Sequence, residues 1–248
     1  MGAVYTIWLR NMKRYFRSKS RIIGSLAQPL LFFLVLGFGL GSVVSASSSG
    51  GVSYIKFIAP GIVAMSVLFT SIFSGIQIIW DRQFGFLKET LIAPVSRISI
   101  MIGQTLGGAS TALVQGFIVF IIAFLVGGLT LNSGFLIAVL FMTLIGISFT
   151  ALGIAVASRM RDMQGFQLII NFVVMPLFFL SGALFPLGNS SVLKTIGYAN
   201  PLTYGVEGIR YGILGTSTIN PFVSLIVLGS FALIMIFLGG YSFKKMKV

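Results

Sequence analysis

Charged residues divide the chain into long stretches that contain none. These charge-free stretches are residues 22–55, 57–80, 98–158, 163–193 and 211–243. A helix needs about 20 apolar residues to cross the roughly 30 Å hydrocarbon layer of a membrane. Four stretches therefore predict one span each, and the longest predicts two spans, interrupted by the glycine-rich segment 127–134. The expected fold is all-α and polytopic, with six spans at residues 22–40, 57–80, 100–126, 135–157, 166–185 and 222–241.

Residues 1–21, ahead of the first span, follow a helical period. At about 100° per residue, apolar and aromatic side chains share one face, with Ile7 as the exception: Val4, Trp8, Met12, Tyr15 and Phe16. Basic side chains share the other face: Arg10, Lys13, Arg14 and Arg17. The pattern predicts an interfacial amphipathic helix with its bases on anionic lipid, and a plain cluster of topogenic charge is the alternative. A cleaved signal peptide is disfavoured because the following apolar run exceeds the usual h-region of about 7–15 residues.

The connection at residues 81–99 carries a second helical pattern. Phe84, Leu87 and Leu91 recur at helical spacing, and Lys88 and Glu89 lie beside them. Pro94 would end this helix, and Ser96 can cap the next one. The segment is either an ordinary interfacial loop or a docking element for a cytoplasmic partner.

The last part of the chain combines polar and proline signals with apolar ones. Asn171 and Pro176 lie within the fifth predicted span, which indicates a face turned toward a cavity, a partner or neighbouring helices of the same chain. Residues 186–220 are too apolar for a free loop. Asn200-Pro201 predicts a helix start, Gly215 its end, and Asn220-Pro221 the start of the sixth span. We expect an outer re-entrant helical hairpin at 186–220, with Glu207 and Arg210 as a weak surface pair.

Composition supports a membrane setting. The chain is 56% hydrophobic and only 8% charged, with a mean hydropathy of +1.04, whereas soluble domains carry about 25% charged residues. With the N-terminus inside, 14 basic residues fall on inner segments and 3 on outer ones, Lys56, Lys194 and Arg210. This bias predicts that both termini are cytoplasmic. It also accounts for the net charge of +13 without nucleic acid.

Several kinds of chemistry are excluded or disfavoured by residue type. The chain has no histidine and no cysteine, so it can build neither a His/Cys metal site nor a histidine general base. The segment 103–110 has glycines at phosphate-loop spacing but lacks the lysine, and it fits close helix packing better. The predicted spans carry no ionisable group for ion coupling. We expect a chain that is not an enzyme, binds no cofactor itself and depends on a separate motor.

Three segments resemble a known family. Residues 81–97, Asp-Arg-Gln-Phe-Gly-Phe-Leu-Lys-Glu-Thr-Leu-Ile-Ala-Pro-Val-Ser-Arg, resemble the inner-loop signature of type 2 ABC exporter permeases, and are closest to the daunorubicin-resistance-like drug-efflux permeases. Residues 181–187, Ser-Gly-Ala-Leu-Phe-Pro-Leu, look like that family's outer end of the fifth span. Residues 200–210, Asn-Pro-Leu-Thr-Tyr-Gly-Val-Glu-Gly-Ile-Arg, look like its outer helix. The resemblance covers residues 1–248 as one transmembrane domain.

The resemblance implies a multidrug-efflux type of machine in the cytoplasmic membrane. A second permease copy would pair with this chain, most simply as a homodimer, and separate ABC subunits would bind ATP and magnesium. It implies coupling to the ATPase through Phe84, Phe86, Leu87, Lys88, Glu89 and Leu91. It implies a translocation pathway or dimer face at Asn171, Met175, Pro176 and Phe179, and an outer gate at Tyr204, Glu207 and Arg210.

The substrate class stays open at this point. The resemblance does not select among drugs, peptides, polysaccharides and lipo-oligosaccharides, which permeases of this architecture all export. The basic-aromatic groove expected of a glycan conduit is not evident in the sequence, which favours a hydrophobic or amphipathic molecule, a drug or a lipid. The sequence also leaves open a motor-independent flippase or channel subunit, and a membrane scaffold or immunity protein.

Overall fold

The computed structural model describes residues 2–39, 41, 53–86, 95–129, 134–160, 162–187 and 191–246, and this part of the chain contains helices and no strand. The all-α prediction is therefore confirmed. In chain order the helices are α1 (Gly2–Arg17), α2 (Lys19–Gly39), α4 (Tyr54–Ser74), α5 (Ile76–Gln83), α7 (Arg97–Gly127), α8 (Phe135–Ala157), α9 (Met163–Phe179), α10 (Ser191–Ala199), α11 (Pro201–Leu214) and α12 (Pro221–Lys244).

Within the described residues, five helices are long and apolar enough to cross a membrane. These spans are Ile22–Gly39, Tyr54–Gln83, Arg97–Gly127, Phe135–Ala157 and Pro221–Lys244. Each matches a predicted span within a few residues. The spans identify the chain as a membrane protein.

The remaining apolar helix, α9, is shorter than predicted. It has 17 residues and ends at Phe179, whereas the sequence pattern extended the fifth span to residue 185. The helix stops because the chain turns at Leu180, and Gly182 adopts a φ of +72°, a left-handed conformation that glycine accepts readily. The apolar pattern does continue to Phe185, but the last part of it is buried turn, with Ser181, Ala183 and Leu184 covered by other elements. A sixth membrane crossing at α9 stays a prediction.

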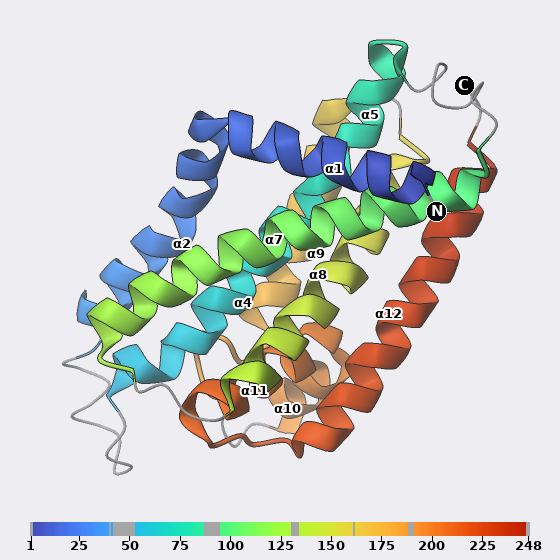
Figure 1. The fold of residues 1–248 in the computed structure, drawn as a ribbon. Coiled ribbons are helices and arrows are strands. Elements are labelled where there is room, and N and C mark those ends of the chain that lie inside the picture. Colours follow the sequence, from blue (N-terminus) through green and yellow to red (C-terminus); the bar gives the residue numbers. More distant parts are fainter. Residues whose placement is uncertain are drawn as a thin grey trace.

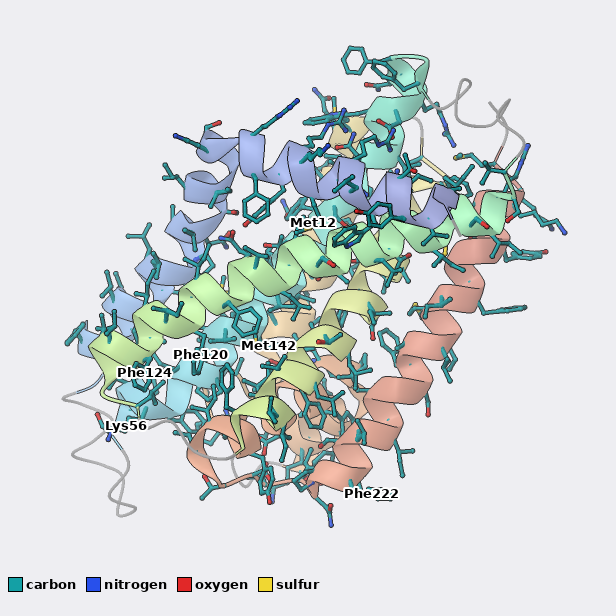
Figure 2. All side chains as sticks on the ribbon, viewed as in Figure 1. Met12, Lys56, Phe120, Phe124, Met142 and Phe222 are labelled. Carbon is teal, nitrogen blue, oxygen red and sulfur yellow. The ribbon has the colours of Figure 1, made fainter. Side chains whose placement is uncertain are left out.

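The long helices form a bundle with two distinct ends (Figure 1). Helix α1 lies across one end, over α7, and meets α2 at an elbow. This end, here called the α1 end, also holds α5, the start of α7 and the last turn of α12. Helices α10 and α11 lie at the opposite end, here called the α11 end. Figure 2 places Met12 at the α1 end, and Lys56 and Phe222 at the α11 end.

Helix α8 lies at the centre and packs against α4, α7, α11 and α12. Its Phe141, Ile145 and Phe149 are fully or almost fully buried. One close approach joins α8 to the last turn of α4: a Cβ atom added at Gly153 would lie 2.5 Å from the carbonyl oxygen of Ile72. Such contact is shorter than van der Waals packing allows, so this crossing depends on glycine.

Candidate functional site

The predicted coupling segment begins at the α1 end. Phe84 forms the C-cap of α5 and is 71% exposed, and Phe86 is also exposed. Leu87, Lys88, Glu89 and Leu91 lie outside the described residues, and so does most of the amphipathic helix predicted there. Ser96 caps α7 by accepting a hydrogen bond of 3.1 Å from the amide of Ser99, which confirms the predicted cap.

Asp81, three residues before Phe84, binds the N-terminal helix to α5. Its side chain is buried at 2% exposure. Arg10 on α1 donates to it over 2.8 Å, Gln77 donates over 3.0 Å, and Arg14 lies at 3.7 Å. Two of the bases expected to face lipid therefore turn toward the protein instead.

Arg82, the next residue, binds a different neighbour. Its guanidinium donates to the carbonyl oxygens of Met160 at 2.8 Å and Ser158 at 3.0 Å. These carbonyls lie at the end of α8, where backbone acceptors lack helical partners and favour a cation. Trp80 on the same helix turns its indole N–H toward the sulfur of Met163 at the start of α9. The end of α5 thus contacts α1, α8 and α9 just before the predicted coupling segment.

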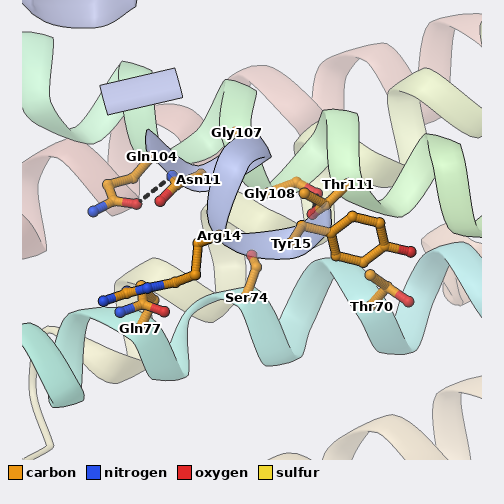
Figure 3. Close-up of a pocket in the computed structure, with 10 residues that line it drawn as sticks. All are labelled: Asn11, Arg14, Tyr15, Thr70, Ser74, Gln77, Gln104, Gly107, Gly108 and Thr111. Atoms are coloured by element: carbon orange, nitrogen blue, oxygen red, sulfur yellow. Dashed lines mark hydrogen bonds between the residues drawn. The ribbon is translucent and has the colours of Figure 1, made fainter. Parts of the chain in front are cut away.

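Helix α1 is also tied to α7 by polar side chains (Figure 3). Asn11 donates to Gln104 over 2.7 Å, and the indole N–H of Trp8 donates to the hydroxyl of Ser110 over 3.0 Å. The Tyr15 hydroxyl donates to Gln115, whose side chain is fully buried. These bonds fix both the rotation and the position of α1 on the bundle.

The small residues of α7 allow this approach. A Cβ atom at Gly103 would lie 2.9 Å from Cβ of Ile7, and one at Gly107 would lie 2.7 Å from Cβ of Asn11. The interpretation of segment 103–110 as a helix-packing surface is therefore confirmed. Ile7, the exception to the amphipathic pattern, is one of the buried residues of α1, because it faces Gly103 rather than the membrane.

A small cavity lies between α1, α4, α5 and α7. It is lined by polar side chains that include Asn11, Arg14, Gln77 and Gln104. Its volume of about 30 Å³ suits water and is far below the roughly 300 Å³ of a small-molecule site. This junction is therefore built to join helices and has no room for a transported molecule.

At the α11 end, Glu207 and Arg210 form a buried ion pair on α11. They are 3% and 6% exposed, so the prediction of a weak surface pair is wrong. Arg210 also donates to the carbonyl of Gly182 over 2.9 Å, and its guanidinium lies 4.4 Å from the ring centre of Phe57. The hydroxyl of Thr218 donates to Glu207 over 2.7 Å.

These contacts bind α11 to α4, to the turn after α9 and to the segment before α12. Burial lowers the pKa of Arg210, and the Glu207 carboxylate opposes that shift by its charge and hydrogen bond. Tyr204 lies nearer the surface, where its hydroxyl donates to the carbonyl of Tyr198 over 2.8 Å. The three predicted gate residues thus divide into a buried pair and a peripheral tyrosine.

The boundaries of the elements at this end agree with their sequence signals. Asn200 caps α11 by accepting from the amide of Leu202 over 3.0 Å, and Gly215 ends that helix in the left-handed conformation. Asn220 caps α12 in the same way, through the amide of Phe222. The re-entrant placement of α10 and α11 in a membrane stays a prediction.

The predicted pathway or dimer residues lie on one helix, α9. Asn171, Pro176 and Phe179 are exposed, and Met175 is half-buried. Leu168 and Phe172 on the same helix are 72% and 83% exposed. Neighbouring helices of this chain therefore leave much of α9 uncovered, Asn171 included.

The sequence reasoning missed the junction around Asp81. The charge pattern placed Asp81 at the end of a span and Arg10 on a lipid-facing surface, 71 residues away along the chain. One signal was present: Asp81 is one of only four acidic residues, and an acid next to the membrane requires a partner. The sequence contains many basic residues, so only the folded structure shows which of them pairs with Asp81.

Comparisons with known proteins agree with this architecture. The model of a protein family described as ABC-2 type transporter matches residues 2–214. Nodulation protein J of Rhizobium leguminosarum bv. trifolii is 29% identical over 218 residues, which cover 86% of this chain and 82% of that protein. The putative transport permease ycf38 of Porphyra purpurea is 30% identical over 79% of this chain and 68% of its own length. The inner membrane transport permease YadH of Escherichia coli is 26% identical over 88% of this chain and 85% of its own length.

Proposed function

The chain belongs to the ABC-2 type transporter family, and from this premise we propose that it is the membrane-spanning permease subunit of an ATP-driven exporter. The observation that carries the proposal is the family match from α1 through α11, together with relatives named as transport permeases. The chain brings the membrane helices. A separate ABC subunit, with its ATP and magnesium, supplies the energy.

The α1 end supports a route from motor to permease. Exposed Phe84 and Phe86 begin the proposed docking segment, which continues through Leu87, Lys88, Glu89 and Leu91. Immediately before it, Asp81 holds α1 and Arg82 holds the end of α8. Movement of the segment is transmitted to α1 through Asp81 and to α8 through Arg82, since each hydrogen bond is short and partly buried.

In the proposed topology the chain crosses the cytoplasmic membrane six times, with α9 as the fifth crossing. At about 1.5 Å per residue, α9 is roughly 25 Å long, a little short of the hydrocarbon thickness. The buried turn after Phe179 completes the crossing. The α1 end, with both termini, faces the cytoplasm, as the distribution of basic residues indicates.

A second copy of the chain completes the transporter in this proposal. The uncovered side of α9, with Asn171, Met175, Pro176 and Phe179, then faces either the partner or the pathway between the two copies. Glu207 and Arg210 lock the outer end in the described conformation rather than line an open route. The transported molecule is proposed to be hydrophobic or amphipathic, a drug or a lipid-like compound.

The proposal is tested by co-expressing the chain with an ATPase encoded next to it and measuring ATP hydrolysis in lipid nanodiscs. Phe84→Ala is expected to weaken binding of the ATPase by about fivefold or more, because truncating an interface aromatic costs above 1 kcal/mol. Phe222→Ala is the matched control. Phe222 is 68% exposed against 71% for Phe84, but it lies at the α11 end (Figure 2).

Two results would count against the proposal. If the ATPase does not co-purify with the wild-type chain, the permease loses its motor, and a channel or scaffold role becomes the better explanation. If Phe84→Ala and Phe222→Ala change the binding of the ATPase equally while the wild-type complex is stable, the docking segment is wrongly placed.

A further inference from the structure

The elbow between α1 and α2 carries a cationic recess. Helix α1 ends at Arg17, Ser18 breaks the helix, and α2 begins at Lys19. The recess has a volume of about 800 Å³, and its lining contains five basic residues: Arg10, Lys13, Arg14, Arg17 and Lys19. Ser18 and Ser20 add hydroxyl groups. The recess therefore offers charge and hydrogen-bond donors to an anion.

Most of this positive charge is not neutralised within the described part of the chain. Asp81 pairs with Arg10 and Arg14, whereas no carboxylate partner is found there for Lys13, Arg17 or Lys19. Like charges gathered where two helices meet repel one another. An anionic ligand would relieve that repulsion.

A second recess lies further along α2. It has a volume of about 270 Å³ and lies between α2 and α4, with Tyr15 of α1 beside it. Its lining is mostly apolar and aromatic, with one side-chain amide and two aliphatic hydroxyls: Gly24, Ser25, Gln28, Pro29, Phe69, Thr70 and Phe73. From Lys19 to Gln28 the helix rises about 13 Å. A charged recess and an apolar recess thus follow one another within the length of a phospholipid.

The surroundings favour a lipid as the occupant. The outward side of α2 exposes Ile23, Leu31 and Val35, which in a membrane protein contact acyl chains. Gly24 leaves the apolar recess open, since a Cβ atom there would meet nothing within 4 Å.

We propose that the α1–α2 elbow is a binding site for one anionic phospholipid of the bilayer, with its phosphate in the cationic recess and an acyl chain between α2 and α4. The bound lipid would brace the elbow, because it contacts the last turn of α1, the first turns of α2 and the last turns of α4. The site needs no ATPase, so it stands or falls separately from the proposed function.

The test is native mass spectrometry of the purified full chain with dioleoylphosphatidylglycerol or dioleoylphosphatidylcholine, which share their acyl chains and differ in charge. The wild-type chain is expected to retain one phosphatidylglycerol in preference to phosphatidylcholine. Arg17→Gln/Lys19→Gln is expected to weaken this binding by about fivefold for each cation removed. Lys244→Gln/Lys245→Gln removes two cations at the same end of the bundle and is expected to bind as the wild type does.

The acyl-chain half of the site has its own pair of variants. Gly24→Leu fills the apolar recess and is expected to abolish the retained lipid. Gly240→Leu on α12 is the matched control, since a Cβ atom there also meets open space. Ser25→Leu serves as a second filling variant if Gly24→Leu does not fold.

Three outcomes would overturn the proposal. Equal retention of the two lipids would remove the role of the phosphate charge. Equal loss in both double-cation variants would mean general surface attraction. Unchanged binding in both filling variants would mean that no acyl chain enters the recess between α2 and α4.

Discussion

At the residue scale, two buried carboxylates hold the ends of the bundle. Asp81 joins α5 to α1 at one end, and Glu207 joins α11 to the segment before α12 at the other. Each accepts hydrogen bonds from charged or polar donors, which are stronger than neutral pairs. Removing one partner leaves the other buried without compensation, and that cost exceeds the net value of the pair.

Asp81→Asn should loosen helix α1. The variant weakens the bonds from Arg10 and Arg14, and hydrogen bonds to charged groups are worth about 1.5–3 kcal/mol. The check is labelling of Ile7→Cys by a maleimide, which is specific because the chain has no natural cysteine. Labelling should accelerate in the Asp81→Asn background and stay unchanged with Lys13→Gln; equal rates in all three would contradict the assignment.

Glu207→Gln should destabilise the α11 end by about 3–5 kcal/mol, because it leaves Arg210 buried without a counter-charge. Thermal unfolding in detergent measures the change. The double variant Glu207→Leu/Arg210→Met should recover much of the loss, since it removes both charges. If the single and double variants melt together well below the wild type, packing rather than charge stabilises this end.

These residues also show which features the sequence pattern predicts and which it does not. The pairing of Glu207 with Arg210 was visible from their spacing, yet its burial was not. Burial depends on Phe57 and Gly182, which approach only after the chain folds. Ile7 is similar: its departure from the amphipathic pattern has a cause, Gly103, that lies 96 positions further along the chain.

At the element scale, local sequence signals set where helices start, and glycine residues allow helices to pack closely. Ser96, Asn200 and Asn220 each cap the helix that the sequence predicted, because a cap depends only on neighbouring residues. The end of α9 was predicted wrongly, since it depends on the turn at Gly182 and on Arg210 from α11.

Gly153→Ala should weaken the packing of α8 against α4 by about 1–3 kcal/mol, the usual cost of overpacking. The added methyl group would press on the carbonyl of Ile72, which is backbone and cannot rotate away. Gly229→Ala on α12 is the control: its Cβ would meet open space, so the change should be neutral or slightly stabilising. Thermal unfolding measures the melting temperatures of both variants, and equal values would contradict the close approach of α8 to α4.

At the scale of the whole molecule, the bundle leaves one face of α9 uncovered. Leu168 and Phe172 are spaced to lie on one face, and both are largely exposed. Association in a membrane depends on close side-chain packing rather than on escape from water. A second copy packed on α9 would supply that packing.

Leu168→Ala/Phe172→Ala should therefore shift the proposed dimer to monomer, as measured by light scattering after size-exclusion chromatography. Leu233→Ala/Phe237→Ala on α12 has the same spacing and a similar exposure of 71% and 74%, so it is expected to leave the dimer intact. A dimer that survives the α9 change and dissociates with the α12 change would move the interface to α12.

The chain contains only two tryptophans, and the contacts described above place both at the α1 end. The indole of Trp8 is bonded to α7, and that of Trp80 faces Met163 at the start of α9. Emission excited at wavelengths that only tryptophan absorbs consequently originates from the contacts between α1, α5, α7 and α9. No tryptophan lies at the α11 end, so a change in tryptophan emission on adding a nucleotide or a lipid would report the α1 end without any attached dye.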